Sequence, residues 1–489
     1  MTTGMNTCMT MIIKNHKKII LKITAVLLVA AVIFVAIKIL LQDRMIPEAK
    51  WINRVVANEQ IKVILDDKVV LVSDAKSSDN SNLEEIIWKS EENILVQDVL
   101  LQDIDESGED ELLLLCFKRG RYGKHKPFWV EDDETVWSQH IYIYDFIDNE
   151  VRPKWMASDI GIDVDSWDYD LDNKCLALVD SSGEKSYWKW LTWGLAKIDP
   201  AVRILVAGDN IIHMPILKMA QKEGMNFDFA YEDIRDVVQK YDIAAVVQET
   251  PLVNEGAMYS DYPEFGTPKE VARALKKAGF DMALCATNHM MDKGVYGVET
   301  TRDAFESEEM ICLGIEDLEY LKLDKKGMVI GMLDYTYGLN GHEASVKGKV
   351  YVHTLVDEKK IRESIRRARS ECDAVIMFVH WGTEYDDTVD DYQERWVQIF
   401  SEEGVDVVIG SHPHVVQKSE MITNDMGHEM VVFYSLGNFL SAQTEEDRRN
   451  GIMAEINIMK SDGSVIVDSY SKIDIEDVYD NGIVKVKIK

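Results

Sequence analysis

The pattern of apolar and polar positions divides the chain into three parts, and the first ends near residue 46. Residues 19–41 form an almost uninterrupted apolar run, and basic residues lead into it: Lys14, Lys17, Lys18 and Lys22. A run of about 20 apolar residues is long enough to cross a bilayer as a helix. Basic residues mark the cytoplasmic side, so the pattern predicts a single-pass cell-membrane anchor with a cytoplasmic N-terminus and an extracellular remainder. A cleaved signal peptide is the alternative, but no small-residue cleavage site follows the run.

Residues 47–198 show short apolar runs separated by acidic turns, with many aromatic residues and little helical periodicity. The pattern predicts a β-rich accessory domain. Its clearest strands are at residues 61–65, 69–72, 112–117, 140–144 and 187–193. The pattern leaves open whether these strands build propeller blades or another β fold.

From about residue 199, apolar β runs alternate with helical stretches, which is typical of βαβ architecture. We expect an α/β domain across residues 199–489. Its predicted strands cover 204–207, 243–247, 282–286, 374–379, 405–409 and 430–434. Its predicted helices cover 231–239, 268–278, 298–306, 358–370 and 392–403.

Charge and cysteine content narrow the classes of function. The chain carries 54 basic and 86 acidic side chains, which give a formal net charge of -32. This charge repels nucleic acid and argues against nucleic acid as a partner. An anionic substrate must therefore be attracted locally, by a metal or a basic pocket. The six cysteines include no C-x-x-C pair, so we expect small buried residues and neither a disulfide framework nor a zinc site.

One acidic loop in the β-rich domain, residues 103–111, carries oxygen side chains at alternate positions around a glycine. The candidate calcium ligands are Asp103, Asp105, Ser107 and Glu111. Calcium prefers several oxygen ligands from a flexible loop, and this segment resembles the calcium loops of propeller-blade repeats. A solvated acidic turn is the alternative, because the whole chain is acidic.

Polar side chains follow the predicted strands of the α/β domain, and in open sheets the carboxyl ends of strands meet at one crevice. They are Asp209, Glu249, Asn288, His289, His380, His412 and His414. Carboxylate, amide and imidazole groups bind divalent manganese, iron or zinc. One histidine at a strand end is more often structural, but four of them with two carboxylates favour a metal or catalytic centre. The alternating pair His412-Pro413-His414 can present two imidazoles to adjacent metals.

Six short motifs occur in order through this domain. They read GD at 208–209, ETPL at 249–252, NHMMDKG at 288–294, HWGTEY at 380–385, GSHPH at 410–414 and YSLGNF at 434–439. The set resembles the CapA family of capsule-synthesis, or poly-gamma-glutamate biosynthesis, proteins over about residues 200–445. That family is similar to calcineurin-like metallophosphoesterases. The resemblance implies a four-layer α/β/β/α sandwich with a two-metal centre.

The resemblance also implies which residues hold the metals. The implied ligands are Asp209, Glu249, Asn288, His380, His412 and His414. Asp209 and His414 would bind one ion, and Glu249 would bridge the two ions. Asn288, His380 and His412 would bind the second ion. By the same resemblance His289 would act as a general acid or stabilise the transition state. Asp292 or Glu384 would orient an imidazole as a catalytic support.

The sequence departs from the phosphoesterase pattern at the first metal. Where phosphoesterases carry Asp-x-His, this chain has Asp209-Asn210-Ile211, so one imidazole is missing. His213 lies too far along to be a simple replacement, and we expect Asn210 to assist. Glu249 stands where the phosphoesterases use aspartate, and its longer arm changes the metal spacing. One bound metal is therefore an alternative to two.

Other residues near these motifs have plainer interpretations. Trp381 and Tyr385 are more typical of packing than of a substrate platform. Gly437-Asn438 is expected to be a tight turn below the pocket. The charged run at residues 445–449 is expected to be a solvated surface turn, with a substrate-facing role as the alternative.

Three hypotheses of function follow. The leading one is a cell-surface, metal-dependent hydrolase or transferase that acts on an envelope or capsule polymer related to poly-gamma-glutamate, or on a phosphoester. The second is a non-catalytic, membrane-anchored component of a polyglutamate synthesis or export complex, which binds polymer and other capsule-synthesis membrane proteins. The third is a binding module centred on the β-rich domain.

Overall fold

The computed structural model describes residues 46–75, 86–119, 137–156, 160–254, 258–315, 318–346, 349–480 and 483–489. The chain divides into two compact units between Asp199 and Pro200. The predicted membrane anchor at residues 19–41 lies outside the described residues. Within the residues described, no helix is both long enough and apolar enough to span a membrane.

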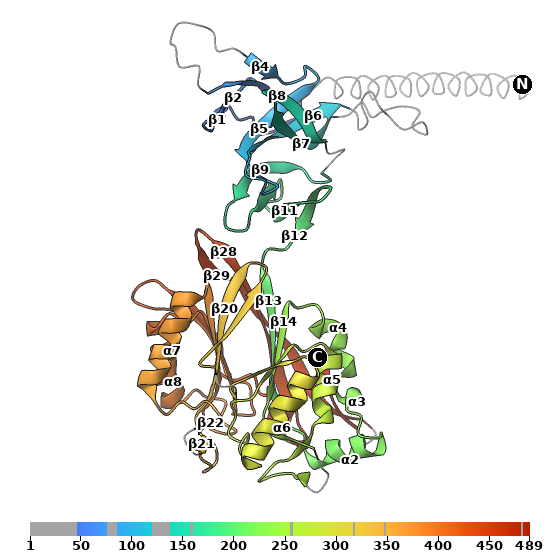
Figure 1. Cartoon of the computed structure of the whole chain (residues 1–489). Helices are drawn as coiled ribbons and strands as arrows, with labels where there is room; N and C mark the ends of the chain where they lie inside the picture. Colours follow the sequence, from blue (N-terminus) through green and yellow to red (C-terminus); the bar gives the residue numbers. More distant parts are fainter. Residues whose placement is uncertain are drawn as a thin grey trace, which may run out of the picture. The chain divides into compact units, whose positions relative to one another are not determined.

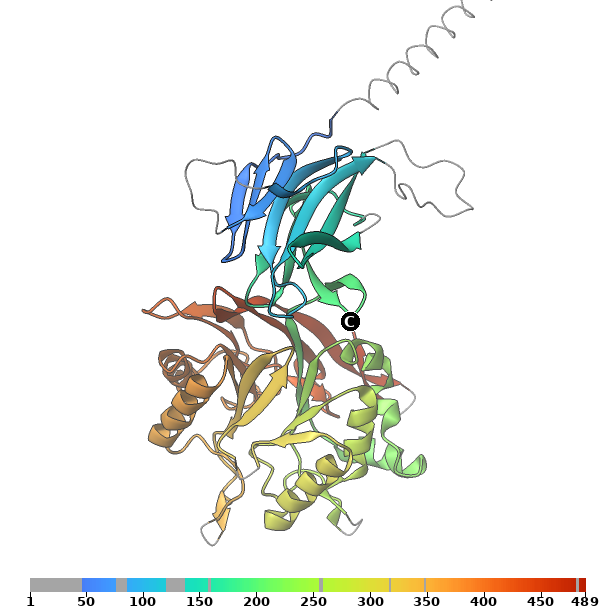
Figure 2. The same ribbon diagram turned by 45° about the horizontal axis from the view of Figure 1, so that its top comes forward.

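The described residues of the N-terminal unit form three four-stranded antiparallel sheets, each built from strands that are consecutive in the chain (Figures 1 and 2). The first comprises β1 (Arg54–Ala57), β2 (Ile61–Asp66), β3 (Val69–Asp74) and β4 (Ile86–Lys89). The second comprises β5 (Ile94–Gln102), β6 (Glu111–Arg119), β7 (Trp137–Ile147) and β8 (Glu150–Met156). The third comprises β9 (Val164–Asp170), β10 (Cys175–Asp180), β11 (Lys185–Leu191) and β12 (Gly194–Ile198).

The second sheet is buried on both faces, because successive side chains of a strand point to opposite sides. On β6, Leu112 and Leu114 pack in a core shared with the first sheet. Leu113 and Leu115 pack in a core shared with the third sheet. The three sheets are therefore stacked through two separate apolar layers.

The acidic loop between β5 and β6 holds a cation of the protein itself. The Lys154 ammonium lies 2.6 Å from Asp105, 2.7 Å from Glu111 and 2.9 Å from Asp145, measured from Nζ to a carboxylate oxygen. The Asp103 carboxylate accepts hydrogen bonds from the backbone of residues 107 and 108, and the Ser107 hydroxyl accepts one from Glu109. Asp103, Asp105 and Glu111 do lie together, as the calcium hypothesis requires. However, the Lys154 ammonium already pairs with two of the four candidate calcium ligands, Asp105 and Glu111.

The C-terminal unit contains two large sheets. The first runs in the order β18 (Ile311–Leu313), β17 (Met282–Leu284), β14 (Ile243–Gln248), β13 (Val202–Asn210), β28 (Asn450–Ser461), β29 (Ser464–Asp480) and β30 (Ile483–Ile488), with β27 (Asn438–Leu440) paired to β13. The second runs in the order β19 (Leu321–Lys325), β20 (Met328–Thr336), β23 (Ala374–His380), β24 (Val407–Ser411), β26 (Glu429–Phe433) and β25 (Ser419–Thr423). The inner strands from β18 to β13 and from β20 to β26 are parallel.

Helices cover the outer face of each sheet (Figure 1). On the first sheet these are α2 (Met214–Lys222), α3 (Asp228–Tyr231), η2 (Glu232–Ile234), α4 (Arg235–Val238), α5 (Glu270–Ala278) and α6 (Gly294–Ser307). On the second they are α7 (Glu358–Glu371) and α8 (Asp391–Glu402). The segment predicted as one helix at residues 231–239 is helical, but it is divided among the short helices α3, η2 and α4. The helix α2 was not predicted.

Alternation along the strands explains the layers. On β13, Ile204 and Val206 enter the apolar core between the two sheets, while Leu205 and Ala207 face the helices. On β23, residues 374, 376 and 378 enter the same inter-sheet core, and residues 375, 377 and 379 face α7 and α8. The unit is thus a helix, sheet, sheet, helix sandwich, and its parallel strands deliver their carboxyl ends to one region.

If Lys154 fills the acidic loop, calcium should not stabilise the wild-type protein. We expect no rise in the melting temperature with added Ca²⁺ in thermal unfolding followed by circular dichroism. Lys154→Met removes the internal cation and leaves three carboxylates together, so this variant should melt lower and should regain stability with Ca²⁺. Lys174→Met, which removes a more exposed lysine paired with Glu106 of the same loop, is the control. A wild-type protein stabilised by Ca²⁺ would support the calcium hypothesis instead.

A second stability prediction concerns Glu403, which follows α8. Its carboxylate accepts two hydrogen bonds of 2.6 Å from Arg366 and one of 2.7 Å from Arg362. Burial by itself would raise the pKa of Glu403. The two guanidiniums outweigh burial, so the pKa is lowered. A carboxyl group whose pKa is lower in the folded state stabilises the fold at pH values above its unfolded pKa of about 4.3. This stabilisation is lost as the pH falls through the folded pKa.

Glu403→Gln should therefore lower the free energy of unfolding by about 1–3 kcal/mol at pH 7. The variant should also lose less stability than the wild type between about pH 5 and pH 2. Urea unfolding at several pH values measures both effects. Glu363→Gln, on the exposed face of α7, is the matched control and should change little. Equal acid sensitivity of wild type and Glu403→Gln would contradict the assignment.

Candidate metal centre

The six implied metal ligands come together at the carboxyl ends of the parallel strands of both sheets. From the first sheet come Asp209 on β13, Glu249 directly after β14, and Asn288 after β17. From the second come His380, the last residue of β23, and His412 and His414 after β24. All six side chains are buried. The convergence follows from the parallel order of the strands, which places their ends along one edge of each sheet.

Asp209, Glu249 and His414 form the first group of donors. The Nδ1 atom of His414 is 3.2 Å from Oδ2 of Asp209, and its Nε2 is 3.6 Å from Oε1 of Glu249. Oδ1 of Asp209 and Oε2 of Glu249 are buried and accept no hydrogen bond from the described residues. A buried carboxylate oxygen without a partner is costly. One carboxylate oxygen of each residue and one nitrogen of His414 also lie within 4.8 Å of one another, which is a grouping that could hold a cation.

Asn288, His380 and His412 form the second group. The Nε2 atom of His380 is 3.0 Å from Oδ1 of Asn288 and 3.2 Å from Nδ1 of His412. Donor atoms bound to one ion at about 2.1 Å lie roughly 3.0–3.4 Å apart in octahedral or tetrahedral geometry. The spacing of the second group therefore matches a coordination sphere.

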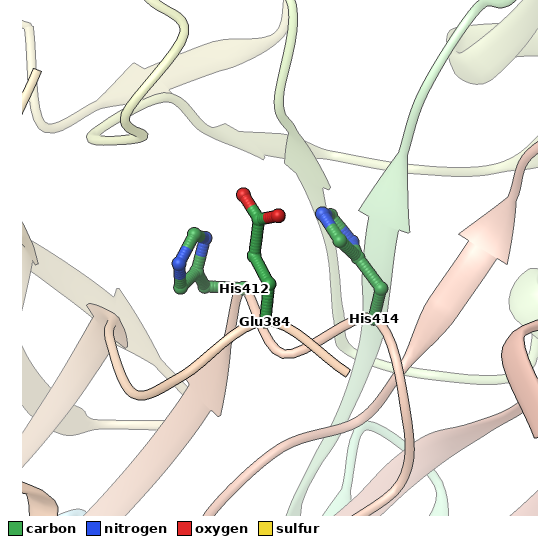
Figure 3. A group of neighbouring side chains, drawn as sticks. All are labelled: Glu384, His412 and His414. Carbon is green, nitrogen blue, oxygen red and sulfur yellow. The ribbon is translucent and has the colours of Figure 1, made fainter. Parts of the chain in front are cut away.

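Glu384 adds a donor that belongs to neither group. Its carboxylate lies within 4.8 Å of a nitrogen of both His412 and His414. Figure 3 shows this carboxylate pointing between the two imidazole rings. Glu384 was expected to orient an imidazole. Its position suits it equally as a direct ligand at the open side of the centre, because the residue is exposed whereas both histidines are buried.

The backbone holds the ligands in an unusual conformation. His412 and His414 have φ angles of 100° and 60°, which residues other than glycine seldom adopt. The backbone N–H of His412 donates to Oδ2 of Asp209 at 3.2 Å. A Cβ on Gly410 would lie 2.1 Å from the backbone oxygen of Tyr434, so only glycine fits there. Strain of this kind persists where the surrounding structure fixes it, as at functional sites.

Burial and neighbouring charges shift the pKa values of several ligands of the centre. Burial raises the pKa of Glu249 to about 8. Burial lowers the pKa of His414, but Glu249 and Asp209 outweigh it and raise that pKa to about 9. Burial lowers the pKa of His412 to about 3 and that of His380 well below its usual value. Neutral imidazoles keep the lone pair that a metal needs.

His289 and Asp292 form a hydrogen-bonded pair beside the second group. Nδ1 of His289 lies 2.7 Å from Oδ2 of Asp292, which also accepts a hydrogen bond from the backbone N–H of Phe265. Burial lowers the pKa of His289, but Asp292 and Glu249 reverse this and raise it above its usual value. Phe265 packs edge-on against the His289 ring. Because Nδ1 is engaged, Nε2 is the nitrogen through which His289 can exchange a proton.

Three further side chains support the ligands. Oγ of Ser411 lies 2.8 Å from Nδ1 of His380, and Oδ1 of Asn438 lies 3.1 Å from Nδ1 of His414. Asn340 contacts both Asn288 and His289 at 3.4–3.5 Å. Ser411 and Asn438 stand inside the motifs, but the motif pattern predicted only a turn at 437–438, whereas Asn438 begins β27. In the sequence, the Asn340-Gly341 pair predicts a turn. It does not indicate that Asn340 contacts Asn288 and His289.

Asn210 does not take the place of the missing imidazole in this structure. The Asn210 amide donates to Gln248, and its oxygen accepts from the Tyr231 hydroxyl, so the expected assistance at the first metal is not seen. Successive side chains of β13 point to opposite faces, which turns Asn210 away from the partners of Asp209. Nδ1 of His213 accepts a hydrogen bond from the backbone N–H of Ala442.

The two aromatic residues of the HWGTEY motif differ in role. Trp381 is fully buried, and its indole N–H donates to the backbone oxygen of Tyr434 at 2.9 Å. Trp381 is therefore a packing residue. Tyr385 is 42% exposed, and its ring centroid lies 5.9 Å from that of His414. Tyr385 thus stands beside the metal centre at the protein surface.

Comparisons with known proteins match the part of the chain that carries the centre. Residues 203–443 match the family model described as "Bacterial capsule synthesis protein PGA_cap". The PGA biosynthesis protein CapA of Bacillus subtilis (strain 168) is 26% identical over 273 residues, which cover 54% of this chain and 69% of the relative. The capsule biosynthesis protein CapA of Bacillus anthracis is 27% identical over 277 residues, which cover 54% of this chain and 65% of the relative.

Among solved structures, the calcineurin-like phosphoesterase YfkN from Bacillus subtilis aligns with a TM-score of 0.35 and 14% identity, over 56% of this chain and 91% of that one. The family model spans the strands and loops that hold all six implied ligands. The resemblance seen in the motifs is confirmed. Through its C-terminal unit, this chain is similar to the bacterial capsule synthesis protein family PGA_cap.

Proposed function

We propose that the C-terminal unit is a metal-dependent hydrolase of capsule synthesis, acting at the cell surface on an anionic envelope polymer related to poly-gamma-glutamate or on a phosphoester. One observation carries this proposal. Asp209 and Glu249 each keep a buried oxygen without a hydrogen-bond partner among the described residues, next to converging imidazoles. Such a group of donors suits manganese, iron or zinc, as one ion or two.

Divalent metals bound there would polarise the bond to be cleaved and stabilise negative charge as it develops. The residues of the chain supply the rest. Asp292 fixes the His289 ring through Nδ1, which prepares Nε2 to donate a proton to the leaving group. Ser411 and Asn438 hold the rings of His380 and His414 in place. Glu384 at the exposed side completes the donors facing the substrate.

Metal content tests the centre directly. We expect purified protein loaded with Mn²⁺, Fe²⁺ or Zn²⁺ to retain one or two ions per chain after desalting, as measured by elemental analysis. Asp209→Asn removes the charge of a carboxylate that keeps one buried oxygen without a hydrogen-bond partner among the described residues. The variant should therefore retain at most half as much metal. Metal should raise the melting temperature of the wild type but not that of the variant. Asp468→Asn, an identical change at an exposed strand position, is the control. Equal metal content in all three proteins would overturn the centre.

Activity tests the chemistry. Metal-loaded wild type should hydrolyse an aryl phosphodiester or a glutamate polymer. His289→Ala should lower kcat by about 10²- to 10⁴-fold while it retains metal, because it removes the proton donor and not a ligand. Arg273→Gln on the exposed side of α5 should match the wild type. If metal binds and polymer binds but no substrate is turned over with any of the metals, the non-catalytic component of a capsule complex replaces the hydrolase.

A further inference from the structure

Arg448 lies against the side of the metal centre that carries Tyr385. It belongs to the short helix α9 (Glu446–Arg449), within the charged run that the sequence suggested was a solvated turn. Its guanidinium carbon lies 3.7 Å from the centroid of the Tyr385 ring. That ring in turn lies beside the ring of His414. A guanidinium this close to a tyrosine ring is a cation–π contact.

Two backbone contacts fix this arrangement. The side-chain Nδ2 of Asn438 donates to the backbone oxygen of Arg448 at 2.8 Å. The side-chain Oδ1 of the same residue lies 3.1 Å from Nδ1 of His414. The backbone N–H of Tyr385 donates to the backbone oxygen of Pro413 at 2.8 Å, between the two ligand histidines. Arg448 is therefore tied to the metal centre by its backbone and by its aromatic platform.

Within the described residues the guanidinium of Arg448 pairs with Glu445 at 3.5 Å, and its Nε is buried without a hydrogen-bond partner. Much of its hydrogen-bonding capacity is therefore unused among these residues. Arginine presents five N–H donors in a planar fork that fits a carboxylate or a phosphate. The neighbouring Glu384 and the ligands Asp209 and Glu249 are acidic, so a local cation is what would admit an anion to this side of the centre.

We infer that Arg448, on its Tyr385 platform, is an anion subsite that selects substrates with a second oxyanion beside the group placed at the metals. The inference rests on the proposed function and refines it, because it requires an oligoanionic substrate. Glutamate carboxylates and phosphates share the oxyanion chemistry that the fork recognises. Arg448 is a specificity residue in this scheme and takes no part in bond cleavage.

Equilibrium binding tests the subsite without turnover. Titration calorimetry with metal-loaded protein should show that Arg448→Gln binds a glutamate polymer about tenfold more weakly than wild type. Arg448→Lys should recover only part of the loss, because an ammonium lacks the fork. Tyr385→Leu should weaken binding less than Arg448→Gln while it leaves the charge in place. Arg273→Gln, an identical change away from the centre, should bind as the wild type does.

Two comparisons identify the anion. A glutamate polymer with esterified carboxylates should lose the difference between wild type and Arg448→Gln if carboxylates are bound. Inorganic polyphosphate should show the difference if phosphates are bound. Arg448→Gln should weaken the binding of the polymer more than the binding of a monoanionic aryl phosphodiester. KM measures the latter wherever turnover is measurable. Melting temperatures and metal content of each variant confirm that fold and centre are intact.

The subsite is overturned if Arg448→Gln, folded and metal-loaded, binds both polymers as tightly as Arg273→Gln does. That result would leave the proposed hydrolase standing, because the metal ligands and the proton donor His289 are other residues. A wild-type protein that binds polymer through Arg448 but hydrolyses nothing would support the subsite and refute the hydrolase.

Discussion

The structure of the C-terminal unit depends on burying two carboxylates whose charge the protein does not fully neutralise. Asp209 and Glu249 lie inside a sandwich whose other buried positions are mostly apolar, and each retains an oxygen without a hydrogen-bond donor in the described chain. Taking a carboxylate out of water costs several kcal/mol in a protein interior, which is a large part of the stability of a domain. A fold that keeps two such groups side by side requires a cation there, either as protons held by His414 and Glu249 or as metal.

The two sheets make this arrangement possible. Each sheet has one face against helices and the other against its partner sheet, so its strands are nearly continuous apolar runs. The polar ligands of the centre are placed where the strands end. Parallel order places those ends on one edge, and the sandwich brings the edges of both sheets together. Of the six implied ligands, the two carboxylates and the amide come from the first sheet and the three imidazoles from the second.

Close backbone contacts give the centre its rigidity. Gly410 allows the chain after β24 to pass against Tyr434, and the next residues turn through positive φ angles to aim His412 and His414. Asn438 joins His414 to the segment that carries Arg448. Metal ligands, the His289–Asp292 pair and the proposed anion subsite are therefore linked through a few loops on one rigid scaffold, which is the arrangement that preorganised sites need.

By itself, the sequence determined the α/β class of the C-terminal part, the strands that carry the ligands, and the types of the ligands. These features depend on local patterns, because an apolar run followed by Asp209 or His380 describes both a strand and its polar end. The tertiary structure alone decided the directions and partners of side chains. It placed Lys154 among the acidic residues of the 103–111 loop and turned Asn210 into the core. It also set Glu384 between two imidazoles and laid Arg448 on Tyr385. Such contacts join residues far apart in the chain, and they depend on strand register and backbone torsion, which a local pattern of residue types does not encode.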